Sequence, residues 1–105
     1  MIKVTYYEEH DEISMKVKGH ADYAPYGEDV VCAAVSTLAQ TLLAYLNIDN
    51  EKFDYSMREG LIWAYAKGSN VRTAFHVIMA GFHLIEENYP DYLTINRGCA
   101  IQRTP

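Results

Sequence analysis

The spacing of apolar residues is the feature of this sequence that most constrains its fold, because it changes from a β-type to a helical period and back. Apolar and polar side chains alternate over residues 2–7 and 13–19, on either side of the acidic cluster 8–12. Alternation turns one face of a strand toward a core, so these segments predict a β-hairpin whose turn lies in the acidic cluster. A second hairpin is predicted over residues 53–65, with its turn at residues 58–60.

Each predicted hairpin is followed by a segment with helical periodicity. Residues 30–46 carry no charge and follow Asp29, a residue type that caps helix N-termini well. The second helix is expected to begin after residue 70 and to stop at Pro90, and residues 92–95 are expected to form a last strand. The order ββαββαβ predicts an α+β fold, in which a mainly antiparallel sheet carries both helices on one face.

Composition limits the classes of function. The chain has 105 residues, typical of one domain, and a formal net charge of -5. An acidic chain is a poor candidate for direct nucleic-acid binding, which needs cationic surface, but it suits a basic polypeptide partner. We expect no signal peptide, and the uncharged stretch 30–46 is shorter than the roughly 20 residues of a membrane span. With two cysteines, a cytoplasmic protein with reduced thiols is expected.

Cys32 is the first residue that could carry chemistry, since it falls in the first turn of the first predicted helix. The positive end of the helix dipole favours a thiolate there, and first-turn N–H groups could stabilise an oxyanion. The alternative is that Cys32 is a small buried hydrophobe. His20, twelve residues earlier at a predicted strand end, could pair with the thiol or lie exposed as an ordinary polar residue. By strand parity it continues the polar face, unless the strand ends at Gly19.

The other candidates give weaker signals. Tyr23 and Tyr26 lie in the loop before the helix, where aromatic residues often contact ligands. His76 and His83 are seven residues apart, which is not a metal-ligand spacing, and we expect neither a metal nor another cofactor. Cys99 lies near the C-terminus and is expected to be incidental.

The second predicted helix has two apolar edges. Its second edge consists of Thr73, Val77, Ala80 and Leu84. Together with the uncharged first helix, this edge predicts a homodimer, because exposed apolar patches usually mark interfaces. The alternative is that both helices are thoroughly buried within the monomer.

One segment resembles a known family signature. The motif consists of Gly19-His20-Ala21 followed by Gly27-Glu28-Asp29-Val30-Val31-Cys32-Ala33-Ala34-Val35-Ser36. It is similar to the signature of the ribosomal-processing cysteine protease (Prp) family, over roughly residues 1–95. The resemblance implies a single protease domain over 1–95, with residues 96–105 as a C-terminal tail. It also implies a dimeric endopeptidase that removes the N-terminal extension from the precursor of large-subunit ribosomal protein twenty-seven.

On this resemblance, His20 and Cys32 are the catalytic pair, and the loop between them is mobile and becomes ordered around the substrate. We expect the N–H groups of Cys32 and Ala33 to hold the oxyanion. Asp29 either caps the helix or takes part in catalysis. The residues expected to contact substrate are Asp22, Tyr23, Tyr26, Gly27 and Ser36.

Three alternatives remain open from the sequence. The chain could be a prophage-type relative that cleaves a capsid or scaffold protein. It could be a non-catalytic module that binds the tail of a ribosomal or phage protein. It could also be a redox sensor whose reactive group is Cys32.

Overall fold

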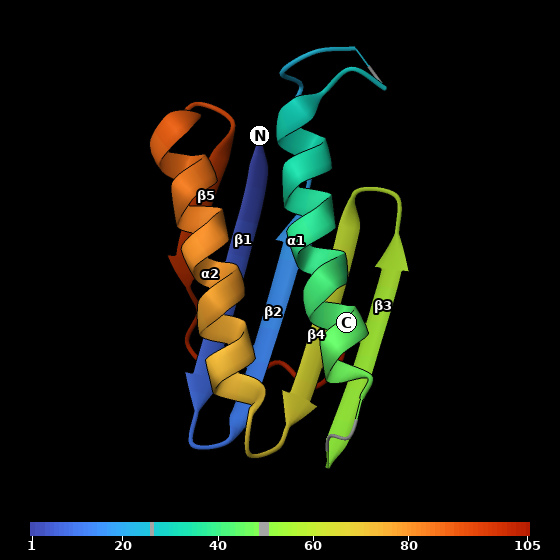
Figure 1. Cartoon of the computed structure of the whole chain (residues 1–105), viewed down its shortest axis with the longest axis vertical. Helices are drawn as coiled ribbons and strands as arrows, with labels where there is room; N and C mark the ends of the chain where they lie inside the picture. Colours follow the sequence, from blue (N-terminus) through green and yellow to red (C-terminus); the bar gives the residue numbers. More distant parts are fainter. Residues whose placement is uncertain (26, 49–50) are drawn as a thin grey trace.

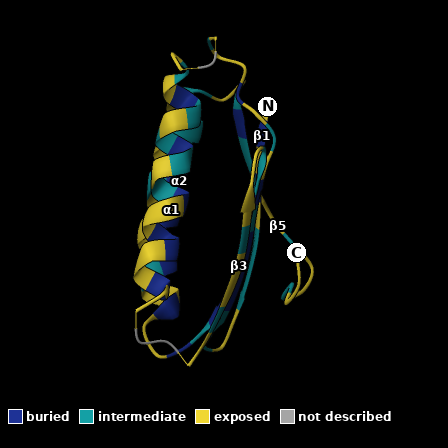
Figure 2. Ribbon diagram, turned by 90° about the vertical axis from the view of Figure 1, so that its right-hand side faces the viewer, coloured by how far each residue is buried: buried dark blue, intermediate teal, exposed yellow. Residues whose placement is uncertain are grey.

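The computed structural model describes residues 1–25, 27–48 and 51–105, which form a sheet with both helices on one face (Figures 1 and 2). The predicted order ββαββαβ and the α+β class are confirmed. The elements are β1 (Ile2–Glu9), β2 (Glu12–Lys18), α1 (Val30–Leu46), β3 (Lys52–Arg58), β4 (Leu61–Lys67), α2 (Val71–Asn88) and β5 (Leu93–Arg97).

The sheet is mixed. Its strand order is β3-β4-β2-β1-β5, and every neighbouring pair is antiparallel except β1 and β5. In that parallel pair Ile2 lies opposite Leu93. The first strand is therefore internal, with β2 on one side and the last strand of the fold on the other.

The turn of the first hairpin is shorter than predicted, since only His10 and Asp11 separate the strands and the glutamates on either side belong to them. One carboxylate oxygen of Glu8 lies 2.6 Å from Nη2 of Arg72 on α2. Glu12 accepts a 2.5 Å hydrogen bond from the hydroxyl of Tyr65 on β4. Because partners on neighbouring elements hold these carboxylates, the acidic cluster does not interrupt the strands.

The core lies between the sheet and the helices. On β4, small or medium side chains face the helices, and Ala64 and Ala66 are fully buried in this core. The larger side chains that alternate with them, Trp63 and Tyr65, lie on the opposite face, outside this cluster. Trp63 is nevertheless 0% exposed.

The C-terminal segment explains the burial of Trp63. The last strand runs to Arg97, two residues beyond the predicted limit, and the chain then lies against the sheet face that the helices leave open (Figure 2). The carbonyl of Gln102 accepts a 3.1 Å hydrogen bond from the Trp63 indole, and its N–H donates to Oγ of Ser14 at 2.9 Å. Residues 98–105 therefore cover this part of the open face.

The first helix begins and ends where the sequence predicts. Its N-cap is Asp29, and it packs beside α2, where Gly81 lies so close to Leu38 that a Cβ would come within 2.8 Å of the leucine side chain. The second helix ends at Asn88, two residues before Pro90. In the described part of the chain, neither helix is long and apolar enough to cross a bilayer.

Candidate active site

A groove of about 670 Å³ lies at one end of the molecule. It is formed by the residues after β2, the first turns of α1 and the turn between β3 and β4, which lie at the upper end of the view in Figure 1. Both His20 and Cys32 line this groove. The structure thus brings the two predicted catalytic residues to one surface.

Cys32 is the third residue of α1 and is partly buried. It packs against the core cluster while also lining the groove. The sequence left open whether Cys32 is a reactive thiol or a small buried hydrophobe. The structure combines features of both, since the side chain packs against the core and also borders the groove.

His20 leaves the strand direction at Gly19, so it does not simply continue the polar face of β2. Gly19 has a φ of +100°, and a Cβ at this position would lie 2.5 Å from the carbonyl oxygen of Met1. Glycine is the residue that tolerates both the left-handed backbone and the close approach. This turn directs His20, which is exposed, into the groove.

In the described residues, no hydrogen bond joins the imidazole of His20 to the thiol of Cys32. The imidazole instead lies near the β3–β4 turn, close to Gly60. Catalytic hydrogen bonds are often long in substrate-free proteins and tighten when substrate binds. His20 and Cys32 therefore share a groove in this structure but do not form an ion pair.

Asp29 links the loop to the helix. Its Oδ1 accepts the N–H of Cys32 at 2.9 Å, and its Oδ2 accepts the N–H of Tyr23 at 3.0 Å. Burial by itself would raise the pKa of Asp29, but backbone N–H groups hold that pKa below its usual range; they belong to Cys32, Tyr23, Ala24 and Val31. Asp29 is thus the helix cap, and its charge partly offsets the attraction of the helix end for a thiolate.

The two N–H groups expected to hold an oxyanion are both engaged. That of Cys32 donates to the Asp29 side chain, and that of Ala33 donates to the Asp29 carbonyl at 3.0 Å. With Asp29 as the cap, Ala33 is the first residue whose N–H has an acceptor within the helix. Ala33 therefore does not offer the free donor that the sequence led us to expect, whereas the Cys32 N–H becomes free if the Asp29 side chain moves.

The structure places three of the five predicted substrate-binding residues in the groove. Asp22, Gly27 and Ser36 line the groove, and Ser36 accepts a hydrogen bond from Gln40 at 2.7 Å. Tyr23 is not among the groove residues. Tyr26 lies outside the described residues.

Tyr23 packs away from the groove, against the segment that joins α2 to β5. Its ring centroid lies 5.4 Å from that of Tyr89 and 5.1 Å from that of Tyr92, both in edge-on geometry. Aromatic pairs of this geometry contribute beyond simple area burial. In this structure Tyr23 therefore anchors the loop.

Sequence reasoning missed one wall of the groove. This wall is the end of the second hairpin, from Met57 to Leu61. The hairpin was predicted, but its place beside the site depends on the pairing of β2 with β4, in which Lys18 lies opposite Leu61. A glycine in a turn that directly follows a predicted strand was the only local signal.

The remaining candidates do not form a second chemical centre. His76 pairs with Glu8 at 2.8 Å, and His83 lies 3.6 Å from Glu86 on its own helix. Across residues 1–25, 27–48 and 51–105, no cluster of histidine, cysteine and acidic side chains has the make-up of a metal site. Cys99 is exposed.

A thiol-dependent hydrolase needs an activated cysteine and a histidine that can reach it. Here a cysteine in the first turn of a helix and a histidine line the same groove. The family model described as cysteine protease Prp matches residues 1–94. The ribosomal processing cysteine protease Prp of Mycoplasma genitalium is 33% identical over 84 residues, which cover 75% of this chain and 82% of the relative. The chain therefore belongs to the cysteine protease Prp family.

Solved structures share the fold. The ribosomal processing protease Prp from S. aureus, with a covalently linked product peptide, has a TM-score of 0.77 at 21% identity and covers 93% of this chain and 100% of its own. SMU.848 from Streptococcus mutans has a TM-score of 0.68 at 28% identity and covers 92% of this chain and 93% of its own. The first likeness, at this identity, concerns the fold alone.

Proposed function

We propose that this protein is an endopeptidase that removes the N-terminal extension from the precursor of large-subunit ribosomal protein twenty-seven, with Cys32 as nucleophile and His20 as its acid and base. The observation that carries the proposal is the groove that both side chains line, with Cys32 at the N-terminal end of α1. In this proposal the protease domain spans residues 1–95, and residues 96–105 are a C-terminal tail that completes β5 and lies against the sheet. The protein acts in the cytoplasm, where thiols stay reduced.

In the first half-reaction, the Cys32 thiolate attacks the scissile carbonyl carbon, and the carbonyl electrons move onto oxygen. The Cys32 N–H stabilises this oxyanion once it is released from Asp29. When the tetrahedral intermediate collapses, the C–N bond breaks and protonated His20 transfers its proton to the leaving amine. The product is a thioester between Cys32 and the N-terminal fragment.

In the second half-reaction, His20 takes a proton from water, and the resulting hydroxide attacks the thioester carbon. The C–S bond breaks, the thiolate is restored and His20 is again protonated. His20 must approach Cys32 more closely than in the free protein, which requires movement of the loop that follows it. The open groove leaves room for this movement.

Charge and comparison support a peptide substrate. The groove carries three acidic side chains, Asp22, Asp29 and Glu59, and one arginine, Arg58. This balance suits a neutral or basic peptide, such as the terminus of an RNA-binding ribosomal protein. The S. aureus Prp protein has also been solved with a substrate peptide. A phage-type relative that cleaves a capsid or scaffold protein is the alternative within the same chemistry.

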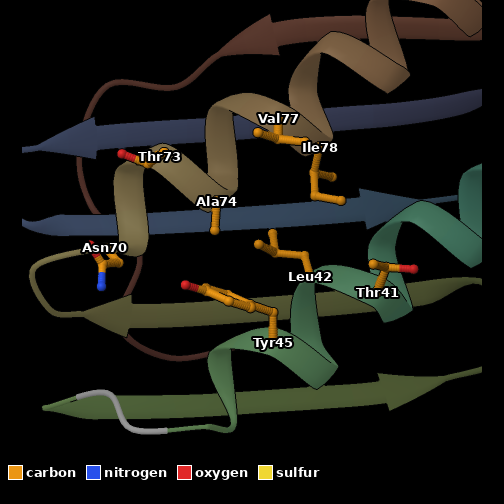
Figure 3. A pocket seen from close by; sticks show the side chains of 8 residues that line it. All are labelled: Thr41, Leu42, Tyr45, Asn70, Thr73, Ala74, Val77 and Ile78. Atoms are coloured by element: carbon orange, nitrogen blue, oxygen red, sulfur yellow. The ribbon is translucent and has the colours of Figure 1, made fainter.

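We propose that the protein is a homodimer through its helical face. A groove of about 370 Å³ lies between α1 and α2, and Figure 3 shows Tyr45 extending from α1 toward the first turns of α2. Val77 is 67% exposed and Leu84 is 61% exposed on the second apolar edge of α2. Apolar surface of this kind favours a partner. Sedimentation of the full chain tests the proposal, since a monomer at micromolar concentration would contradict it.

The decisive experiment is cleavage of the precursor peptide, followed by mass spectrometry. The wild-type protein and Cys99→Ala are expected to cleave equally, because Cys99 is exposed in the tail. Cys32→Ala and His20→Ala are expected to stay folded and inactive. Binding of the peptide by wild type and Cys32→Ala without cleavage would instead identify a binding module. Reversible oxidation of Cys32 without cleavage would identify a redox sensor.

A further inference from the structure

We propose that Gly60 is a positioning residue, which holds the imidazole of His20 at the rim of the groove. The proposal rests on the proposed function, because it assigns a role to the turn between β3 and β4 in the same reaction. Gly60 lies at the tip of that turn, with a φ of +75°. Two independent contacts join it to the Gly19–His20 segment.

The first contact is between backbones. The N–H of Gly19 donates to the carbonyl of Gly60 at 2.9 Å. It extends the β2–β4 ladder, in which Lys18 lies opposite Leu61, by one bond beyond the last paired residues. The residue that directly precedes His20 is therefore fixed to the turn rather than to the loop.

The second contact is steric. A Cβ at position 60 would lie 3.1 Å from Nε2 of His20 and 3.7 Å from its Cε1. The imidazole thus lies so close to Gly60 that a Cβ at this position would make an unusually tight contact and force the ring to shift. In the described residues, no side chain is hydrogen-bonded to the His20 imidazole, so contact with the turn takes the place of the orienting group that a base usually has.

The consequence for catalysis is geometric. The turn belongs to the sheet, whereas the residues after His20 belong to the loop. A rigid surface under the ring limits its positions and leaves the approach toward Cys32 open. Misplacement of a catalytic group by about 1 Å costs on the order of a hundredfold in rate, so a side chain at position 60 should act mainly on kcat.

The test compares Gly60→Ala and Gly60→Asn in the full chain. Both add a Cβ, but asparagine tolerates a left-handed backbone much better than alanine does. If contact with the ring is what matters, both variants lose at least about tenfold in kcat with little change in KM. Gly98→Ala is the matched control, because its Cβ would make only ordinary contacts, at 3.4 Å from the Tyr6 carbonyl.

Nuclear magnetic resonance provides a readout that does not depend on cleavage. In the wild-type protein, we expect a nuclear Overhauser effect between the His20 ring protons and the Gly60 α protons. In both Gly60 variants the His20 ring resonances should shift, while those of His76 and His83 on α2 stay unchanged.

Each outcome bears on the proposal. Wild-type kcat and wild-type His20 resonances in Gly60→Asn would overturn it, because backbone strain alone would then explain the alanine variant. Absence of the Overhauser effect in the wild-type protein would overturn it even if neither variant folds. A wild-type protein that shows the effect but cleaves no peptide would contradict the proposed function and leave the positioning of the ring intact.

Discussion

The carboxylate of Asp29 accepts the N–H of Cys32 at 2.9 Å, and its second oxygen accepts the N–H of Tyr23 at 3.0 Å. One side chain thus caps the helix that carries the nucleophile and fixes the loop that follows the histidine. The same hydrogen bond occupies the N–H group proposed to stabilise the oxyanion. If the Asp29 carboxylate turns away to free the Cys32 N–H, as proposed above, it also gives up its hold on the Tyr23 N–H.

The first prediction concerns the cap. Asp29→Ala should lower the free energy of unfolding by about 1 kcal/mol, the usual cost of losing an N-cap acceptor. Asp29→Asn should lose less, because its side-chain oxygen still accepts the Cys32 N–H. Urea unfolding of the three proteins measures the difference. Equal stability of wild type and Asp29→Ala would show that the cap contributes nothing.

The second prediction concerns pH. Hydrogen bonds hold the pKa of Asp29 below its usual value, so the folded state binds a proton less readily than the unfolded state. The stabilisation is therefore complete above the unfolded pKa of about 3.9 and is lost as pH falls through the folded pKa. The stability gap between wild type and Asp29→Ala should shrink on acidification from about pH 6 to pH 3. A stability gap that widens over this range would contradict the conclusion that the ionised form of Asp29 stabilises the fold.

The third prediction concerns the loop anchor. Tyr23→Ala should remove two edge-on ring contacts and speed amide hydrogen exchange over residues 21–25. The expected cost is about 1 kcal/mol, in the range of a single aromatic pair, because Tyr23 is 44% exposed. Tyr23→Phe is the matched control and should behave as wild type, since the ring rather than the hydroxyl makes these contacts. Faster exchange in the phenylalanine variant would point to a role for the hydroxyl.

The fourth prediction concerns the C-terminal segment. Deleting residues 98–105 should expose Trp63, shift its fluorescence emission to longer wavelength and cost about 2 kcal/mol, as for a large apolar side chain returned to water. Arg103→Ala should cost much less, because the arginine itself is exposed and the change removes only its ion pair with Glu12 and its contact with the Tyr65 ring. Peptide cleavage below the unfolding temperature should persist in both, because the segment lies on the face opposite the helices. An unshifted emission spectrum in the truncated protein would show that residues 98–105 do not cover the indole.

The sequence predicts this fold well where local signals decide it. Helix α1 was expected over residues 30–46 from its lack of charge and the cap at Asp29, and it spans Val30–Leu46. The signature motif brought His20 and Cys32 forward as a pair, and the fold brings both to one groove. In each case the signal lies in the same short stretch of sequence as the feature that it predicts, within residues 19–46.

Features set by distant pairing were not predictable in this way. The place of Gly60 beside His20 follows from the register of β2 with β4, which periodicity does not specify. The burial of Trp63 depends on which sheet face the last residues cover, and alternation alone does not distinguish a face covered by helices from one covered by a tail. The engaged Ala33 N–H is different, because it follows from the Asp29 cap that the sequence predicted: the fourth residue after a cap donates to the cap carbonyl.

The parallel pairing of β1 with β5 also bears on how the chain folds. Ile2 and its partner Leu93 are 91 residues apart in the sequence, so the sheet cannot be completed until β5 has been synthesised. Contacts of such long sequence separation slow folding, because the entropy of closing the chain must be lost before they form. The residues that line the groove, from Ile2 to Ile62, are therefore synthesised before the strand that closes the sheet.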